Sequence, residues 1–234
     1  MVSSIWPYLG FHLLFAGSLS AASPGRLEAI YSPHELPLTA DPRAPHWKDI
    51  EPVIADRDRY GKVVPSHRTE IRARWTKDNL YLLFTCPYEQ LSLRPNPSTD
   101  TETNFLWLND VAEVFVGANF QKIHQYREYQ VSPQGEWVDL DINRLEPSSA
   151  HGWRWNSGFQ VKARIDATRK IWYGEFKIPI RSFDDRGAQE GNEVRINFYR
   201  IQGPEPNRTY INWQPVYQET FHTPEAFGLL RFRK

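Results

Sequence analysis

The feature that most constrains this chain is a series of short strand-like runs separated by turn residues, with no amphipathic helix of any length between them. Residues 69–75 alternate apolar and polar side chains, with Ile71 and Trp75 on one face, as in a half-buried strand. Residues 80–86 are apolar on both faces, which is typical of a central strand. Turn-forming residues at 77–79 connect the two runs, so the sequence predicts a β-hairpin here.

Eight further runs have the same character, and residues 179–183 fit a single helical turn. These runs are 110–116, 124–132, 136–141, 159–165, 171–178, 193–201, 210–213 and 228–232. Short strands at this spacing predict one all-β domain over residues 23–234. The simplest arrangement is an antiparallel β-sandwich of two packed sheets.

The segment before the first hairpin has a different character. Residues 32–49 contain four prolines and Pro52 follows, a density that forbids a long helix and favours an extended strap laid over the core. The chain also has 9 Trp, 11 Tyr and 13 Phe against one Met, which favours a β-rich protein with aromatic surface. The single cysteine, Cys86, lies in an apolar run and is expected to be a buried thiol with no disulfide partner.

Charge and motifs exclude several classes of function. Lys and Arg together number 28, as do Asp and Glu, so no net positive field favours nucleic acid as a partner. The sequence contains no Gly-x-Ser-x-Gly elbow, no His-Glu-x-x-His motif and no phosphate-binding loop. These absences argue against the common hydrolase, zinc-protease and nucleotide-binding classes.

The first residues predict the location of the protein. Residues 1–22 contain no Asp, Glu, Lys or Arg, carry an apolar stretch over 5–19 and end in small residues. This pattern is typical of a secretory signal peptide, with an uncleaved anchor as the alternative. We therefore expect a secreted or periplasmic protein.

Six motifs in a fixed order resemble the family 9 carbohydrate-binding modules and their bacterial relatives, which fall in the wider DOMON-like group of β-sandwiches. They are DNLY (78–81), WLNDVAEVF (107–115), YQVSPQG (129–135), WYGEFKIP (172–179), GNEVRIN (191–197) and PEAFGLL (224–230). The similarity runs from the proline-rich strap to the C-terminus.

The resemblance implies a sugar ring held between two aromatic side chains, with polar side chains reaching its hydroxyls. Matched position by position, one aromatic position falls on Trp107 and the other on Phe221, where the sugar binders of the family carry Trp. The acidic contact falls on Glu113. A polar contact on the next strand falls on Gln130, where those binders carry Arg. Two of the four positions therefore depart from the family pattern.

The residues themselves point in the same direction. C–H groups of a pyranose ring pack on aromatic faces, and its hydroxyls need directional donors and acceptors. Glu113 lies mid-strand between apolar neighbours, where an unpaired carboxylate is costly, so it either faces a ligand or pairs with a neighbouring Arg. Gln130 points away from the core side of its strand and shares a polar face with Tyr126, which completes the candidate site.

Several aromatic residues lie in loop-like segments. Trp107 and Phe221 are loop-borne, where large aromatics serve ligands more often than in strand centres, and a place at the edge of the core is the alternative for both. Trp153 and Trp155 either rim a site or cover a sheet edge, and we favour the sheet edge.

Catalysis is not expected. A glycoside hydrolase needs two carboxylates that flank the scissile bond, and nothing in the spacing of Glu113, Asp139 and Asp141 sets up an acid and a base. We expect a binding module for a mono- or oligosaccharide that supports carbohydrate breakdown, with a separate glycoside hydrolase as a partner. The sequence does not indicate an oligomeric state.

Three alternatives stay open at this point. Some DOMON-like domains bind haem through Met paired with His or Lys; the only Met is Met1, which argues against a haem or redox domain, although His124 and His222 remain as ligands. Structural calcium is the second, since residues 139–141 and 184–185 offer carboxylates without the spacing of a calcium loop. The third is a structural or protein-interaction sandwich whose aromatic surface contacts another protein.

Overall fold

The structure is a computed structural model that describes residues 24–146 and 153–234. The expected signal peptide, residues 1–22, lies outside the described residues. Within them, no helix is long and apolar enough to cross a membrane.

Twelve strands make up the described part of the chain, joined by four single-turn 3-10 helices. The strands are β1 (Arg26–Tyr31), β2 (Val53–Ala55), β3 (Thr69–Trp75), β4 (Asn79–Pro87), β5 (Val111–Gly117), β6 (Gln125–Val131), β7 (Trp137–Asn143), β8 (Gln160–Asp166), β9 (Ile171–Pro179), β10 (Glu193–Gln202), β11 (Thr209–Asn212) and β12 (Gly228–Arg233). The 3-10 helices are η1 (Pro45–Trp47), η2 (Leu106–Leu108), η3 (Ile180–Ser182) and η4 (Pro224–Ala226). All ten predicted strands are present, and η3 is the predicted helical turn.

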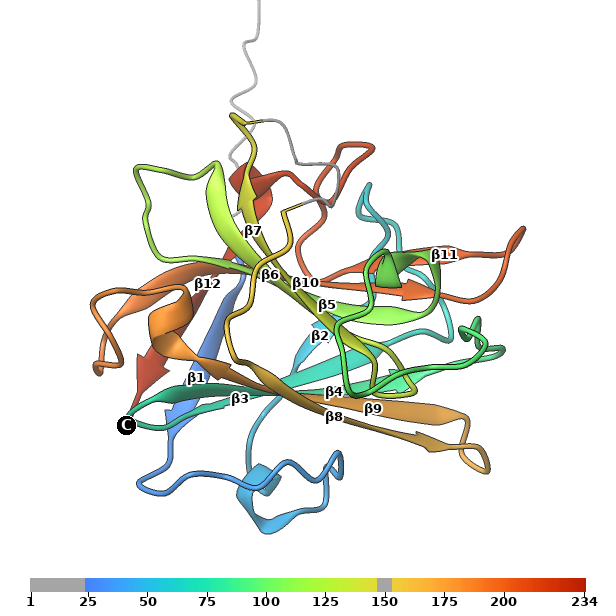
Figure 1. Ribbon diagram of the computed structural model, residues 1–234, viewed down its shortest axis with the longest axis horizontal. Coiled ribbons are helices and arrows are strands. Elements are labelled where there is room, and N and C mark those ends of the chain that lie inside the picture. The colour runs from blue at the N-terminus through green and yellow to red at the C-terminus, as the bar shows by residue number, and fades with distance from the viewer. Residues whose placement is uncertain (1–23, 147–152) are drawn as a thin grey trace, which may run out of the picture.

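The strands form two layers that pack face to face, as predicted (Figure 1). One layer contains β7, β6, β5 and β10, and the other contains β3, β4, β9 and β8. The layers are not separate sheets, because β12 and β1 join them into one hydrogen-bonded path; β11 and β2 pair at its sides with β10 and β3. The sandwich is antiparallel except at β1, which runs parallel to both β12 and β3.

The main core fills the space between the layers. Val114 and Val131 of one layer belong to the same buried cluster as Leu82, Phe84 and Phe176 of the other. These side chains occupy alternate positions of their strands, so the opposite positions of every strand face outward. Cys86 is fully buried in this core without a disulfide, as expected.

The predicted strap covers the outer face of the β4–β9 layer. Trp47 and Ile50 of the strap pack with Tyr81, Leu83 and Tyr173 in a separate buried cluster. Figure 1 shows this segment, in blue, on the side of the layer that faces away from the main core. The strap therefore closes one outer face of the sandwich.

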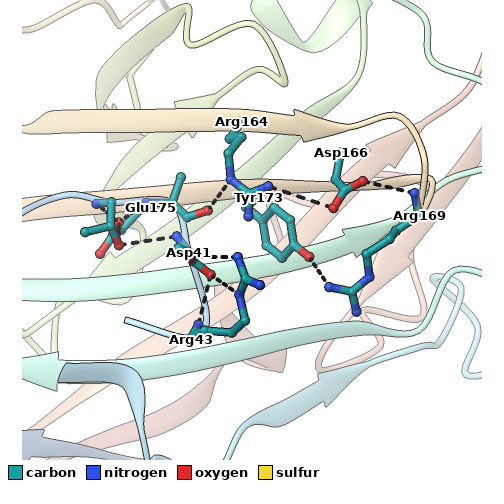
Figure 2. A network of polar contacts seen from close by, with 9 residues as sticks. Asp41, Arg43, Arg164, Asp166, Arg169, Tyr173 and Glu175 are labelled. Atoms are coloured by element: carbon teal, nitrogen blue, oxygen red, sulfur yellow. Dashed lines mark hydrogen bonds and ion pairs between the residues drawn. The ribbon is translucent and has the colours of Figure 1, made fainter. Parts of the chain in front are cut away.

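A buried carboxylate fixes the strap in place. Glu175 of β9 is fully buried and accepts hydrogen bonds from the backbone N–H groups of Thr39 and Ala40, both at 2.6 Å, and from the indole of Trp47 at 2.9 Å. Beside it, the Arg164 guanidinium donates to the Ala40 carbonyl at 3.1 Å (Figure 2). The chain itself thus supplies the donors that this buried carboxylate requires.

Candidate functional site

A cavity of about 550 Å³ opens on the outer face of the other layer, which the strap does not cover. Its floor comes from β5, β6 and β10, and its walls come from the loops that flank them. The lining residues are Arg59, Phe105, Trp107, Glu113, Phe115, Glu128, Leu140, Trp153, Ile201, Tyr210, Glu219, Thr220, Phe221 and His222. A second buried apolar cluster lies on this same outer face, and its members Phe115, Leu140 and Ile201 form part of the lining.

Strand alternation explains which side chains form the floor. On β5, Val114 points into the main core, so its neighbours Glu113 and Phe115 project outward. On β6, Glu128 projects outward in the same way, two residues from Gln130, which pairs across the strands with Glu113. Two carboxyl side chains from adjacent strands therefore lie side by side at the bottom of the cavity.

Both carboxyl groups are almost completely buried, with exposed fractions of 2% for Glu113 and 3% for Glu128. Gln130 Nε2 donates to one oxygen of Glu128, whereas Glu128 Oε2 and Glu113 Oε2 have no hydrogen-bond partner in the described part of the chain. Burial raises the pKa of Glu128 to about 8. Burial, with the neighbouring Glu128 carboxyl, also raises the pKa of Glu113 well above its usual range. The floor therefore holds protons at neutral pH, and one buried oxygen of each carboxyl group has no hydrogen-bond partner in the described residues.

His222 closes the cavity above the acidic floor. Its Nδ1 lies 2.7 Å from the Tyr126 hydroxyl, and its Nε2 lies 4.0 Å from Glu128 Oε2. Burial, together with the positive charge of Arg144, lowers the pKa of His222 to about 4. The imidazole is therefore neutral at neutral pH, and Tyr126 orients it from behind.

Aromatic side chains on separate loops form the walls. Phe221 stacks on Tyr199 of β10 with ring centroids 4.2 Å apart and planes 14° apart. Trp107 lies in η2 and contacts Phe105 edge to face at 5.3 Å. Trp153 contributes an indole N–H that has no hydrogen-bond partner in the residues described. The cavity thus combines aromatic faces with free polar atoms.

Two arginines hold the walls in position. Arg208 Nη2 donates to the carbonyl oxygens of Trp107 at 2.8 Å and Asn109 at 2.9 Å, which fixes the loop that carries Trp107. At the rim, Arg59 forms an ion pair with Glu219 at 3.1 Å. Both guanidinium groups therefore already have protein partners.

Comparison with known proteins then places the chain in a family. Residues 44–234 match the family model described as Carbohydrate family 9 binding domain-like. The chain belongs to this family. No curated protein matches the sequence.

Solved structures show the same fold as this family 9 domain. A proposed carbohydrate-binding protein from Bacteroides uniformis ATCC 8492 has a TM-score of 0.70 at 17% identity, over 90% of this chain and 100% of the other. A family 9 carbohydrate-binding module from Caldicellulosiruptor kristjanssonii in complex with cellotriose has a TM-score of 0.62 at 15% identity, over 89% and 94%. A family 9 module from the same organism in complex with glucose has a TM-score of 0.63 at 15% identity, over 89% of this chain and 96% of the other.

The structure brings three of the five predicted site residues together at the cavity. Trp107, Glu113 and Phe221 all line it. Gln130 and Tyr126 do not line it: Gln130 is fully buried and donates to Glu128, and Tyr126 is buried beside His222. These two residues support the lining rather than form it.

The structure decides between the alternatives for Glu113 and for the pair Trp153 and Trp155. Glu113 forms no ion pair with an arginine in the described part of the chain, so pairing does not explain its burial. Trp153 and Trp155 do cover the edge strand β7, as predicted, since the Asp141 N–H donates to the Trp153 carbonyl and the Trp155 N–H donates to the Asp139 carbonyl. Trp153 also lines the cavity, which was the alternative interpretation of its sequence position.

Glu128 and His222 are two polar lining residues that were not predicted for the sugar site from the sequence. The signal for Glu128 was present, because it lies on the same face of its strand as Tyr126 and Gln130. His222 follows Phe221 in a loop, and nothing in the sequence predicts that this loop folds over β5 and β6.

Three of the four acidic residues considered for calcium have protein partners. Asp139 accepts from the Ser157 N–H at 2.6 Å, Asp141 pairs with Arg127, and Asp184 pairs with Arg186 at 2.8 Å. In the described residues, no group of three or more His, Cys, Asp or Glu side chains is arranged to hold a metal ion.

Proposed function

We propose that this protein binds carbohydrate without catalysing its breakdown, and that a sugar ring occupies the cavity beside Trp107 and Phe221. The observation that carries the proposal is the combination of aromatic walls with two buried carboxyl groups, each of which has one oxygen without a hydrogen-bond partner in the described residues. The complexes of related family 9 modules with glucose and cellotriose support it.

Each part of the cavity matches a part of a sugar. The apolar C–H faces of a pyranose ring pack on Trp107 and Phe221. The hydroxyls reach the outward oxygens of Glu113 and Glu128, and the free indole N–H of Trp153 can donate to a ring or hydroxyl oxygen. The volume of about 550 Å³ lies within the range of small-molecule pockets, which favours one or two sugar units.

The arrangement of the carboxyl groups favours binding over hydrolysis. Glu113 and Glu128 project from neighbouring strands of one floor, and so approach a ligand from the same side. A glycoside hydrolase instead places an acid and a second carboxylate on two sides of the scissile bond. The acidic pair is therefore suited to hold hydroxyls in place.

Isothermal titration with glucose, cellobiose and cellotriose tests the proposal. Saturable binding is expected for the full chain, with a loss of at least about thirtyfold in Trp107→Ala and Phe221→Ala, the effect of removing a central aromatic contact. Phe120→Ala is the matched control, because this exposed aromatic lies in the loop after β5, at the end of the strand away from Trp107. Circular dichroism checks each fold. Absence of saturable sugar binding, or unchanged affinity in Trp107→Ala, would refute the proposal.

We further propose that the protein acts outside the cytoplasm, on the evidence of the leader-like residues 1–22. In that setting it would retain sugar for a separate glycoside hydrolase. Mass spectrometry of the protein purified from its host tests the first point, since an N-terminus after Ala22 is expected. An intact Met1 on the exported protein would contradict cleavage.

A further inference from the structure

The two carboxyl groups of the cavity floor have no positive partner in the part of the lining that the structure describes. Five acidic or basic side chains line the cavity: Glu113, Glu128, Glu219, Arg59 and His222. Arg59 and Glu219 form an ion pair at the rim. His222 is neutral at neutral pH, because burial and Arg144 lower its pKa. The two floor carboxyls therefore have no positive partner among the described lining residues.

The nearby Arg208 does not act as a positive partner for either floor carboxyl. Arg208 lies close enough for its charge to act on Glu113, yet its Nη2 donates to the backbone carbonyls of Trp107 and Asn109. Glu128 has only the amide of Gln130, which is uncharged. A buried carboxylate that lacks a counter-ion is costly, which is why the floor holds its protons at neutral pH. An occupant that brings positive charge allows one floor carboxyl to ionise beside it, which a neutral occupant does not.

The geometry also matches the donors of an ammonium group. Glu113 Oε2 and Glu128 Oε2 are two unpartnered acceptors on one floor, and an ammonium group has three N–H donors, whereas a hydroxyl has one. The aromatic rings of Trp107, Phe115 and Phe221 line the same space. Aromatic faces attract cations, most strongly where water is excluded.

We infer that the cavity selects a sugar that carries a protonated amine, such as a hexosamine unit, over the corresponding neutral hexose. This inference rests on the proposed carbohydrate binding and specifies the class of sugar that is bound. The ammonium group lies between Glu113 and Glu128, and the rest of the ring packs on the aromatic walls. Charge-assisted hydrogen bonds are about twice as strong as neutral ones, which corresponds to a preference of about tenfold.

Titration of the full chain with three sugars that differ only at carbon 2 tests the inference. Glucosamine, glucose and N-acetylglucosamine are compared by calorimetry at about pH 6, where the free amine is protonated. Glucosamine is expected to bind about tenfold more tightly than either neutral sugar. Ethylamine, titrated alongside, is expected to bind far more weakly, because it lacks the ring that packs on the aromatic walls.

Variants then locate the preference. Glu113→Gln and Glu128→Gln each keep an amide of similar shape and should reduce the ratio of glucosamine to glucose affinity to below about threefold. Glu190→Gln, an exposed carboxylate in the loop before β10, should leave the ratio unchanged.

The outcomes separate this inference from the proposal beneath it. If glucose binds as tightly as glucosamine, or if the ratio survives in both Gln variants, the amine preference is wrong while carbohydrate binding stands. If none of the sugars binds, carbohydrate binding fails and the inference fails with it. If ethylamine binds as tightly as glucosamine, the cavity recognises amines rather than sugars.

Discussion

Replacing Glu128 with Gln should change how the stability of the protein depends on pH. Glu128 is buried in the cavity floor, and burial raises its pKa from 4.5 to about 8. Between these two values the unfolded chain has lost the proton that the folded protein retains. The folded state is therefore favoured below pH 4.5 relative to alkaline pH, and this advantage is lost as the pH rises through about 8.

The size of the effect follows from the displacement of the pKa. Each tenfold change in an ionisation constant corresponds to about 1.4 kcal/mol, so a pKa moved from 4.5 to about 8 costs about 5 kcal/mol of unfolding free energy at alkaline pH. About 4 kcal/mol of this loss falls between about pH 5 and pH 9. Glu128→Gln keeps a hydrogen-bonding side chain of the same size and removes the ionisation.

Urea unfolding followed by tryptophan fluorescence measures the difference. The free energy of unfolding of Glu128→Gln minus that of the wild type should rise by about 4 kcal/mol from about pH 5 to pH 9. Glu190→Gln, whose carboxylate is exposed, should follow the wild type throughout. If Glu128→Gln and the wild type show parallel pH dependence, the carboxyl of Glu128 does not titrate in a buried site and the reasoning is refuted.

Three further measurements test other parts of the structure. Glu175→Ala removes the acceptor of three N–H donors and should lower the free energy of unfolding by about 3 kcal/mol. It should also expose residues 32–49 to protease. An uncleaved strap at unchanged stability would contradict this. Gly174→Ala places a methyl carbon 2.8 Å from Val131 Cγ1 and should cost about 1–3 kcal/mol in thermal unfolding, which unchanged stability would exclude. Glucosamine binding at about pH 6 should release about one proton from the Glu113–Glu128 pair, seen as a buffer-dependent enthalpy that glucose does not show.

The strands that the sequence predicts are mostly apolar or alternating runs bounded by turn residues. In the β3–β4 hairpin, an alternating run and a run that is apolar on both faces flank a short turn. β1 and β2 were not predicted, for two different reasons. β1 pairs in parallel with strands that no turn connects to it, and parallel pairs require long connections that leave no local signal. β2 has three residues, too few for alternation to be recognised.

The residues of the candidate site also differ in how well the sequence predicts them. Glu113 stands out because it interrupts an apolar strand, and the structure places it on the cavity floor. Glu128 does not stand out, because it follows Arg127 in a strand of polar residues that resembles a solvated face. His222 reaches the floor only through the path of a loop between β11 and β12, which depends on contacts far apart in the sequence.

Three buried glutamates show what separates a structural acid from one available to a ligand. Glu175, Glu113 and Glu128 all lie in strands and are almost completely buried, so residue type and burial do not distinguish them. Glu175 receives its donors from the strap, a segment of the same chain that closes over it. No segment in the described part of the chain does this for the outward oxygens of Glu113 and Glu128. A buried carboxyl group needs hydrogen-bond partners. For the two carboxyl groups of the cavity floor, a ligand has to supply the missing partners.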